Sequence, residues 1–238
     1  MTMQRVLLKL SGEALGGEQG TGLEPSILSA LTGEVSGLLD AGVEVAIVLG
    51  GGNLFRGAAL SDAGMDRVVG DRMGMLATVM NGLAMADFLG RSGINAKVFS
   101  AFAMAGIAPG YNRDEVATHL AAGGVAVLAG GTGNPFFTTD TAACLRGIEL
   151  GVDAVLKATK VDGVYDKDPM RHQDAQKFDR ISYDEVLARG LGVMDLTAIV
   201  LCQEHNMPIV VFDMGASGAL AEIAKGGKVG TVVERADA

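Results

Sequence analysis

The sequence predicts an α/β fold, a three-layer α/β/α sandwich with a mainly parallel sheet, and three observations support this prediction. Short runs of Val, Ile and Leu alternate along the chain with longer stretches whose apolar residues recur at helical spacing. The short runs are almost continuously apolar, which is typical of parallel strands that helices cover on both faces. No charge block, low-complexity tract or linker divides the chain, so we expect residues 1–238 to form a single domain.

Seven short apolar runs are expected to be the strands. They are rich in β-branched residues, which fit the pleated surface of a sheet. The first run ends in Lys9-Leu10, so a lysine interrupts it close to its end. In chain order, the predicted strands are residues 6–10, 43–49, 96–99, 125–129, 154–159, 209–212 and 231–233.

Seven longer stretches between these runs are expected to be helices. The first carries Leu28, Leu31, Val35 and Leu38, close to the repeat of one helix face. The second is long and apolar, and we expect its methionines to pack in the core or against another subunit. In chain order, the predicted helices are residues 24–39, 67–89, 112–121, 139–150, 183–188, 195–204 and 218–224.

The composition is that of an acidic globular protein. Of the 238 residues, 49% are hydrophobic and 20% are charged, and the formal net charge is −9. A protein that grips a nucleic-acid backbone is expected to be basic, so nucleic acid is not the expected partner. Cys144 and Cys202 form no CxxC motif, and no apolar run approaches the roughly 18 residues of a membrane span. We therefore expect a cytoplasmic protein without disulfides and without a membrane partner.

Glycine-rich turns follow four of the predicted strands. Ligands bind beyond the carboxyl ends of the strands in an open parallel sheet, so these turns share the expected binding edge. Glycine lets backbone N–H groups approach an anion closely, and Lys9, Arg56 and Lys160 add positive charge at the same edge. Together they predict a polyphosphate site, although turn geometry alone also favours glycine. The turns are Ser11-Gly12, Gly50-Gly51-Gly52-Asn53, Gly130-Gly131-Thr132-Gly133-Asn134 and Thr159-Lys160-Val161-Asp162-Gly163.

Two common nucleotide signatures are absent from the sequence. Without GxxxxGK[ST] the chain is not a Walker A kinase or ATPase, and without GxGxxG at the first helix a nicotinamide enzyme is disfavoured. The three histidines have no metal-ligand spacing, so a zinc site is not expected.

Several segments of the chain carry motifs of a known family. Two of them are Lys9-Leu10-Ser11-Gly12-Glu13-Ala14-Leu15 and Gly50-Gly51-Gly52-Asn53 with Arg56-Gly57, which resemble motifs of the amino acid kinase superfamily. Two more specific ones are Asp71-Arg72-Met73-Gly74-Met75-Leu76-Ala77-Thr78 and Gly131-Thr132-Gly133-Asn134-Pro135-Phe136-Phe137-Thr138-Thr139-Asp140-Thr141-Ala142-Ala143, which resemble those of the bacterial UMP kinases (uridylate kinases) within it. A further match is Lys157-Ala158-Thr159-Lys160-Val161-Asp162-Gly163-Val164-Tyr165, followed by Asp168-Pro169. The resemblance covers essentially the whole chain from Lys9 onward.

This resemblance implies the reaction ATP + UMP → ADP + UDP, with Mg²⁺, in a homohexamer. Members of the family are commonly inhibited by UTP and often activated by GTP, so both nucleotides are candidate effectors. The acceptor is a phosphate monoester that is largely dianionic near neutral pH, so no strong general base is required.

The resemblance implies four catalytic residues. Lys9 would stabilise the transferring group, and Arg56 would hold phosphates with its guanidinium. Asp140 and Asp195 would orient Lys9 and the waters of Mg²⁺. The structural alternatives are a surface lysine and two carboxylates that cap helices. The ATP-binding residues implied in the same way are Lys9, Leu10, Ser11, Gly12, Gly52, Arg56, Thr159, Lys160, Tyr165 and Asp168.

A second set of residues is implied for UMP. Asp71 would accept hydrogen bonds from the ribose hydroxyls, or else be a solvated or capping carboxylate. Phe136 and Phe137 would pack near the base or, like most aromatics after a strand, in the core. The UMP-binding residues implied are Gly51, Asp71, Thr132, Gly133, Asn134, Pro135, Phe136, Phe137, Thr138 and Thr139. The implied effector region, which would otherwise be a flexible loop, is Gly17, Glu18, Gln19, Gly20, Thr21 and Gly22.

Three other functions are weighed against this one. Another kinase of the superfamily would phosphorylate a carboxylate or a carbamate, small acceptors that do not need residues 132–139 or Asp71. A non-catalytic nucleotide- or oxyanion-binding protein on the same fold would keep the glycine loops and lose the cations, whereas Lys9 and Arg56 are present. A nicotinamide enzyme would bind NAD tightly, which is not expected here.

Overall fold

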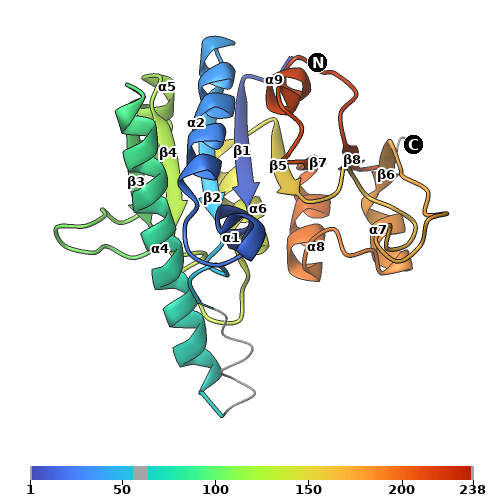
Figure 1. Ribbon diagram of the computed structural model, residues 1–238, viewed down its shortest axis with the longest axis horizontal. Coiled ribbons are helices and arrows are strands. Elements are labelled where there is room, and N and C mark those ends of the chain that lie inside the picture. Colours follow the sequence, from blue (N-terminus) through green and yellow to red (C-terminus); the bar gives the residue numbers. More distant parts are fainter. Residues whose placement is uncertain (1, 56–63, 237–238) are drawn as a thin grey trace.

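An eight-stranded sheet forms the middle layer of the protein (Figure 1). The computed structural model describes residues 2–55 and 64–236. The strands are β1 (Arg5–Leu10), β2 (Glu44–Leu49), β3 (Ala96–Ser100), β4 (Val125–Ala129), β5 (Ala154–Thr159), β6 (Arg180–Ser182), β7 (Ile209–Asp213) and β8 (Thr231–Glu234). Their spatial order is β3-β4-β2-β1-β5-β7-β8-β6, and every neighbouring pair is parallel except β7 with β8. The predicted mainly parallel sheet is confirmed.

Helices cover both faces of this sheet. On one face lie α1 (Gly12–Leu15), α2 (Pro25–Asp40), α4 (Arg67–Arg91) and α9 (Ala219–Ala224). On the other face lie α5 (Arg113–Ala121), α6 (Thr139–Leu150), α7 (Tyr183–Arg189) and α8 (Leu196–His205). Successive residues of β1 alternate between the two cores, because Val6 and Leu8 pack with the first set of helices and Leu7 with the second. The three-layer α/β/α sandwich is therefore confirmed.

Each predicted strand and helix is present, with boundaries that differ by a few residues. The sequence reasoning missed β6, which has only three residues and a charged residue at its start. It also missed α1 and the 3₁₀ turn at Gly17–Gln19, which occupy the region predicted to be a glycine turn and a loop. These elements are too short to show a helical or strand repeat, so their sequence carries no periodic signal.

Helix α4 is the longest helix of the described residues, and its first turns project past the carboxyl edge of the sheet (Figure 1). By length and composition alone it could cross a membrane, the one helix of residues 2–55 and 64–236 that could. It packs instead along β3 and β4, and Met85 and Leu89 are fully buried there. Gly82 lies at this contact, and a Cβ at this position would touch Val127, Ala129 and Val98 at 3.4–3.5 Å, an ordinary van der Waals distance. It is therefore a core helix of the sandwich.

The methionines of α4 divide between two environments. Met75 and Met85 are buried, as predicted for core residues. Met73 and Met80 are exposed and continue a stripe of apolar side chains along the outer side of the helix. We call this the outer stripe of α4, and its residues are Val69, Met73, Leu76, Met80 and Leu83. The spacing of four and three residues places them on one helix face.

Gly230 is required where the chain enters β8. Its φ is +78°, and a Cβ there would lie 2.1 Å from the carbonyl oxygen of Val211 in β7. Both effects oppose any side chain, so we predict that Gly230→Ala lowers the free energy of unfolding by about 2 kcal/mol or more. Urea unfolding measures this change.

The matched control is Gly33→Ala in α2, where no atom lies within 4 Å of the added Cβ. Alanine is the better helix former, so this variant should gain about 0.5–1 kcal/mol. If both variants unfold at the same urea concentration, the conformation assigned to residue 230 is wrong.

Candidate active site

Four neighbouring strands, β4, β2, β1 and β5, bring the predicted glycine turns to one edge of the sheet. The first two turns touch directly. A Cβ on Gly12 would lie 2.6 Å from the backbone nitrogen of Gly52 and 2.8 Å from the carbonyl oxygen of Gly50. Only glycine fits such an approach of two backbones. The prediction that these turns share an edge is confirmed.

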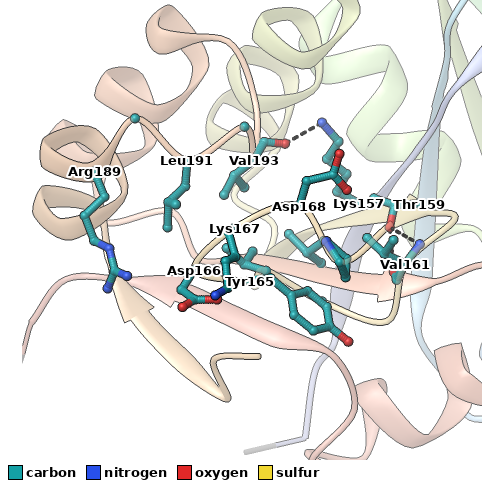
Figure 2. A pocket seen from close by; sticks show the side chains of 16 residues that line it. Lys157, Thr159, Val161, Tyr165, Asp166, Lys167, Asp168, Arg189, Leu191 and Val193 are labelled. Carbon is teal, nitrogen blue, oxygen red and sulfur yellow. Dashed lines mark hydrogen bonds between the residues drawn. The ribbon is translucent and has the colours of Figure 1, made fainter. Parts of the chain in front are cut away.

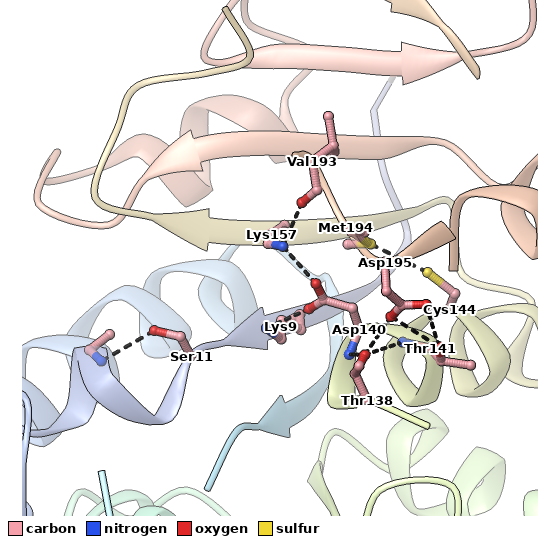
Figure 3. A network of polar contacts seen from close by, with 11 residues as sticks. Lys9, Ser11, Thr138, Asp140, Thr141, Cys144, Lys157, Val193, Met194 and Asp195 are labelled. Atoms are coloured by element: carbon pink, nitrogen blue, oxygen red, sulfur yellow. Dashed lines mark hydrogen bonds and ion pairs between the residues drawn. The ribbon is translucent and has the colours of Figure 1, made fainter. Parts of the chain in front are cut away.

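Two lysines and one carboxylate form a buried cluster beneath these turns (Figure 3). Lys9 of β1 and Lys157 of β5 are paired residues of adjacent strands, so their side chains lie next to each other. Asp140, in the first turn of α6, lies between them. Its Oδ1 is 2.5 Å from Lys9 Nζ, and its Oδ2 accepts a hydrogen bond of 2.7 Å from Lys157 Nζ.

Burial and charge act in opposite directions on this cluster. Burial alone would raise the pKa of Asp140, but the two ammonium groups outweigh it and hold the pKa below its ordinary value. Burial lowers the pKa of Lys157, and Asp140 opposes that change. Lys157 also donates a hydrogen bond of 2.5 Å to the carbonyl oxygen of Val193. Two cations with one carboxylate leave an excess positive charge, which favours an anionic ligand at this position.

Asp195 holds the starts of two helices together. It caps α8, where Oδ1 accepts a hydrogen bond of 3.0 Å from the backbone N–H of Ala198. The hydroxyl of Thr141 donates to the same carboxylate at 2.9 Å, and Thr138 donates as well. Thr138 in turn caps α6, the helix that carries Asp140. Through these bonds Asp195 holds the start of α6, the helix that carries Asp140, and its expected role in orienting Lys9 stays a prediction.

A cavity of about 560 Å³ lies on one side of the cluster (Figure 2). Lys157 lines its inner end, and the segment after β5 forms one wall. Three predicted ATP-binding residues, Thr159, Tyr165 and Asp168, line it. The opposite wall comes from the connection between α7 and α8, which the sequence reasoning did not implicate. The wall residues of that connection are Arg189, Gly190, Leu191, Gly192 and Val193.

Several polar groups of this larger cavity already have partners. The hydroxyl of Tyr165 donates a hydrogen bond of 2.5 Å to Asp162, and this bond raises the pKa of Tyr165. Asp168 accepts a bond of 2.9 Å from the backbone of Met170. The Thr159 hydroxyl donates to the carbonyl oxygen of Val161 at 2.6 Å. These bonds stabilise the segment after β5 that forms this wall, and they hold the Tyr165 ring in place.

A smaller cavity, of about 160 Å³, lies on the other side of the cluster. Helix α4 forms one wall and the turns after β2 and β4 form the other. Seven residues predicted for nucleotide binding line it, namely Gly51, Gly52, Asp71, Thr132, Phe137, Thr138 and Thr139. Gly52 was assigned to ATP by resemblance, but it lies here among the residues assigned to UMP.

Asp71 joins α4 to the turn that follows β4. Its Oδ2 accepts a hydrogen bond of 2.7 Å from the backbone N–H of Phe136, and its Oδ1 pairs with Arg67 at 2.8 Å. Thr78, two turns further along the helix, accepts a bond of 2.8 Å from the N–H of Gly130. Helix α4 therefore holds both ends of the glycine-rich turn that follows β4.

The remaining predicted residues occupy varied positions. Phe136 and Phe137 are 67% and 48% exposed, so the core alternative for them is wrong. Lys160 is exposed, while Leu10 is buried. Ser11 caps α1. Gly133, Asn134 and Pro135 lie on the same turn as Thr132, and Arg56 lies outside the described residues.

The predicted effector segment, residues 17–22, is a short helix and turn rather than a flexible loop. It is fastened to the second glycine turn at Asn53. The N–H of Gly22 donates to the carbonyl oxygen of Asn53 at 3.0 Å, and the Asn53 side chain donates to the carbonyl oxygen of Gly22 at 2.6 Å. Residues 17–22 therefore help to fix the position of the second glycine turn at the binding edge of the sheet.

Lys157 is the principal residue that the sequence reasoning missed. It interrupts an apolar strand near its end, as Lys9 does in the first strand. The same argument that singled out Lys9 could therefore have found Lys157. Its pairing with Lys9 across the two strands, however, depends on the strand order, which the sequence does not display.

Within residues 2–55 and 64–236 no group of three or more His, Cys, Asp or Glu residues could hold a metal ion. Asp140 places one oxygen against each lysine, and Asp195 is bonded to two hydroxyls and an amide. A metal that depends chiefly on protein carboxylates does not fit this arrangement. A divalent cation held mostly by the phosphates of a nucleotide does fit, because Mg²⁺ keeps its waters and needs few carboxylates.

Known sequences resemble this chain along nearly its whole length. A sequence model described as the Amino acid kinase family matches residues 4–213. The chain is 59% identical over 232 residues to the uridylate kinase of Alcanivorax borkumensis, which covers 98% of this chain and 92% of that protein. It is 59% identical over 231 residues to the uridylate kinase of Pseudomonas aeruginosa, with 97% and 94% covered.

Solved structures show the same likeness. The UMP kinase from Bacillus anthracis is similar with a TM-score of 0.96 and 34% identity, covering 100% of this chain and 98% of that one. The uridylate kinase from Archaeoglobus fulgidus is similar with a TM-score of 0.75 and 26% identity, covering 98% of this chain and 100% of that one.

Removing the charge of Asp140 should destabilise the protein in a pH-dependent way. At pH 7, Asp140→Asn leaves two buried ammonium groups without their counter-ion, at an expected cost of about 3 kcal/mol. Because the folded protein holds the pKa of Asp140 below its ordinary value, the unfolded chain takes up the proton first as the pH falls. The stability that Asp140 supplies therefore begins to decline near pH 4, the ordinary pKa of an aspartate, and is lost as the pH falls through the lower pKa of the folded protein, so the gap between the two proteins should narrow over that range.

Urea unfolding of the parent and of Asp140→Asn at pH 7, 5, 3.5 and 2 measures this difference. Asp87→Asn is the control, because Asp87 forms an exposed pair with Arg91 on the surface of α4 and should contribute little at any pH. A gap between parent and Asp140→Asn that stays constant from pH 7 to pH 2 would contradict the charge assignment.

Proposed function

The chain belongs to the amino acid kinase family, and we propose that within this family it is a UMP kinase. It transfers the γ-phosphoryl group of ATP to UMP and releases ADP and UDP. The activity is that of the relatives named uridylate kinase, which match this chain over nearly its full length.

One observation supports this function above the others. The Lys9–Asp140–Lys157 cluster lies between two cavities, since Lys157 lines the larger one and Thr138 and Thr139 line the smaller one next to Asp140. A phosphoryl transfer between two nucleotides needs this arrangement, with a cationic centre where the two phosphate chains meet. We assign the larger cavity to ATP and the smaller one to UMP.

The transfer depends on charge and alignment. UMP brings its own nucleophile, a phosphate oxygen that is already ionised near neutral pH, so the protein need not remove a proton from it. Lys9 would stabilise the negative charge on the equatorial oxygens of the moving phosphoryl group. Asp140 pairs with both Lys9 and Lys157 and holds them between the two cavities, and Asp195 fixes the helix that carries Asp140.

The other site residues bind and orient the nucleotides. We assign the amides of Gly51 and Gly52 to the acceptor phosphate and Asp71 to the ribose of UMP, since all three line the smaller cavity. The threonines of residues 132–139 would donate hydrogen bonds to the same nucleotide. Tyr165 would contact adenine with its ring, and Asp168 would accept from polar edges of the nucleoside. Arg56 keeps its proposed phosphate role.

We infer that Mg²⁺ enters with ATP. It would be held chiefly by phosphate oxygens and waters, with Asp140 reaching it through water, because both oxygens of Asp140 already face lysines. When bound, the ion neutralises part of the phosphate charge.

We further propose that the protein is a single-domain cytoplasmic enzyme that assembles as a homohexamer, with GTP and UTP as effectors. The outer stripe of α4 supports self-association. Its five apolar side chains are 38–58% exposed and form one continuous row, a surface that a monomer seldom leaves in water.

A turnover assay with ATP tests the function directly. We predict that UMP is phosphorylated at least tenfold more efficiently than CMP, and that aspartate, acetylglutamate and carbamate are not phosphorylated, because the smaller cavity is built for a nucleotide. Release of ADP is the measurement. Turnover of a carboxylate or carbamate in preference to UMP would refute the proposal, and nucleotide binding without turnover of any acceptor would indicate a non-catalytic protein.

Lys9→Ala should lower kcat by about 10²–10³-fold, because it removes a charge that acts on the transition state. Stability should fall less than in Asp140→Asn, since Asp140 keeps its bond to Lys157 and the remaining two charges still pair. The control is Lys97→Ala, an exposed lysine near the opposite end of the edge strand β3. Steady-state kinetics and thermal melting are measured on both variants. Equal kcat values in the two variants would remove Lys9 from the mechanism.

A further inference from the structure

Two buried amide side chains face each other behind the smaller cavity. Asn81 of α4 is fully buried and Asn53, in the turn after β2, is 5% exposed. The Asn81 side chain donates a hydrogen bond of 2.7 Å to Oδ1 of Asn53, and Asn53 donates one of 3.1 Å to Oδ1 of Asn81. Neither side chain is among the residues that line the two cavities described above.

The remaining N–H groups of this pair hold backbone. Asn81 Nδ2 donates to the carbonyl oxygen of Gly50 at 2.7 Å, and Asn53 Nδ2 donates to that of Gly22 at 2.6 Å. Each carboxamide has two N–H donors, and all four are used. The pair therefore joins α4, the second glycine turn and the segment of residues 17–22 through a fully satisfied buried network.

The bond to Gly50 determines how the next peptide N–H points. A peptide unit is planar and trans, so its C=O and N–H point in opposite directions. With the oxygen of Gly50 held by Asn81, the N–H of Gly51 is turned away from Asn81. Gly51 lines the smaller cavity, so this direction is the one that an anion there requires.

The turn that contains Gly51 is closely packed on two sides, which restricts its backbone conformation. A Cβ on Gly51 would lie 2.8 Å from the carbonyl oxygen of Gly74 in α4. On the opposite side, a Cβ on Gly12 would lie 2.7 Å from the side-chain oxygen of Asn53. The glycine turn is thus confined between α4 and the first glycine turn, with Asn81 bonded to its carbonyl group.

We propose that Asn81, through its pair with Asn53, is a positioning residue for the acceptor phosphate. It holds the Gly50–Gly51 peptide so that backbone N–H groups are aimed at the phosphate before the nucleotide arrives. This inference rests on the proposed function, because it takes the anion at Gly51 to be the phosphate of UMP. Two apolar side chains would fill the same space without burying four N–H donors. We therefore attribute the presence of two amides here to the backbone groups that they orient.

Asn81→Asp tests the proposal with almost no change in shape. A carboxylate cannot donate, so at pH 8 the bond to Gly50 is replaced by repulsion between two oxygens. A protonated acid can donate, and burial raises the pKa of a carboxyl group, so lowering the pH restores one donor. We expect the KM for UMP to rise at least tenfold at pH 8, with a smaller change in the KM for ATP. Because the UMP phosphate itself takes up a proton near pH 6, the KM values are compared as the ratio of variant to parent at each pH, and this ratio should shrink toward pH 6.

Met85→Ala is the matched control. Met85 is fully buried one turn further along α4, so its removal destabilises the helix without touching the glycine turn. Its KM for UMP should equal that of the parent at temperatures well below melting. If Asn81→Asp does not fold, Asn81→Ser is measured instead, and it should raise the KM for UMP without the pH dependence. A KM in the Asn81 variants equal to that of Met85→Ala would overturn the proposal.

Calorimetric binding of UMP separates this inference from the proposed function. Turnover by the parent reports on the function alone, whereas the ratio of UMP affinity between variant and parent reports on Asn81. If the parent binds UMP without turnover, weaker binding by the Asn81 variants still supports the positioning role. If the parent does not bind UMP, both are wrong.

Discussion

The double ion pair of Asp140 is the interaction on which the rest of the site depends. Removing three charged groups from water is costly, and it is tolerated here because each carboxylate oxygen faces one ammonium group. The same contacts fasten the first turn of α6 to the ends of β1 and β5. The stability of this region and the function proposed for Lys9 therefore depend on the same atoms, and the one positive charge left over lies between the two cavities.

Helix α4 is the second constraint, because it aligns the acceptor side of the site. Asp71, Thr78 and Asn81 lie on the side of the helix that faces the sheet edge, and each holds a different peptide group of the two glycine-rich turns. The turns themselves are too rich in glycine to keep one conformation alone. Helix α4 beside them restricts the conformations that their glycines would otherwise allow. The outer stripe of the helix remains exposed.

The sequence predicted most of the fold because buried parallel strands are continuous apolar runs. It also indicated the binding edge, since glycines and cations follow those runs. It did not predict β6 or α1, which have only three and four residues and so cannot show a repeating pattern. Lys157 and Asn81 were missed for a different reason. A lysine in a strand and an amide in an apolar helix acquire their roles only when distant segments meet, Lys157 across from Lys9 and Asn81 beneath Gly50. Asp195 shows another case, where the helix cap weighed as an alternative is present.

A crystal structure with a non-hydrolysable ATP analogue and UMP bound together tests the central claim most directly. The account predicts that Nζ of Lys9 lies within hydrogen-bond distance of the γ-phosphate, while Asp140 still bridges Lys9 and Lys157. The nucleotides should occupy the two cavities on either side. Phosphates bound elsewhere, or a Lys9 side chain turned away from them with Asp140 unpaired, would contradict it.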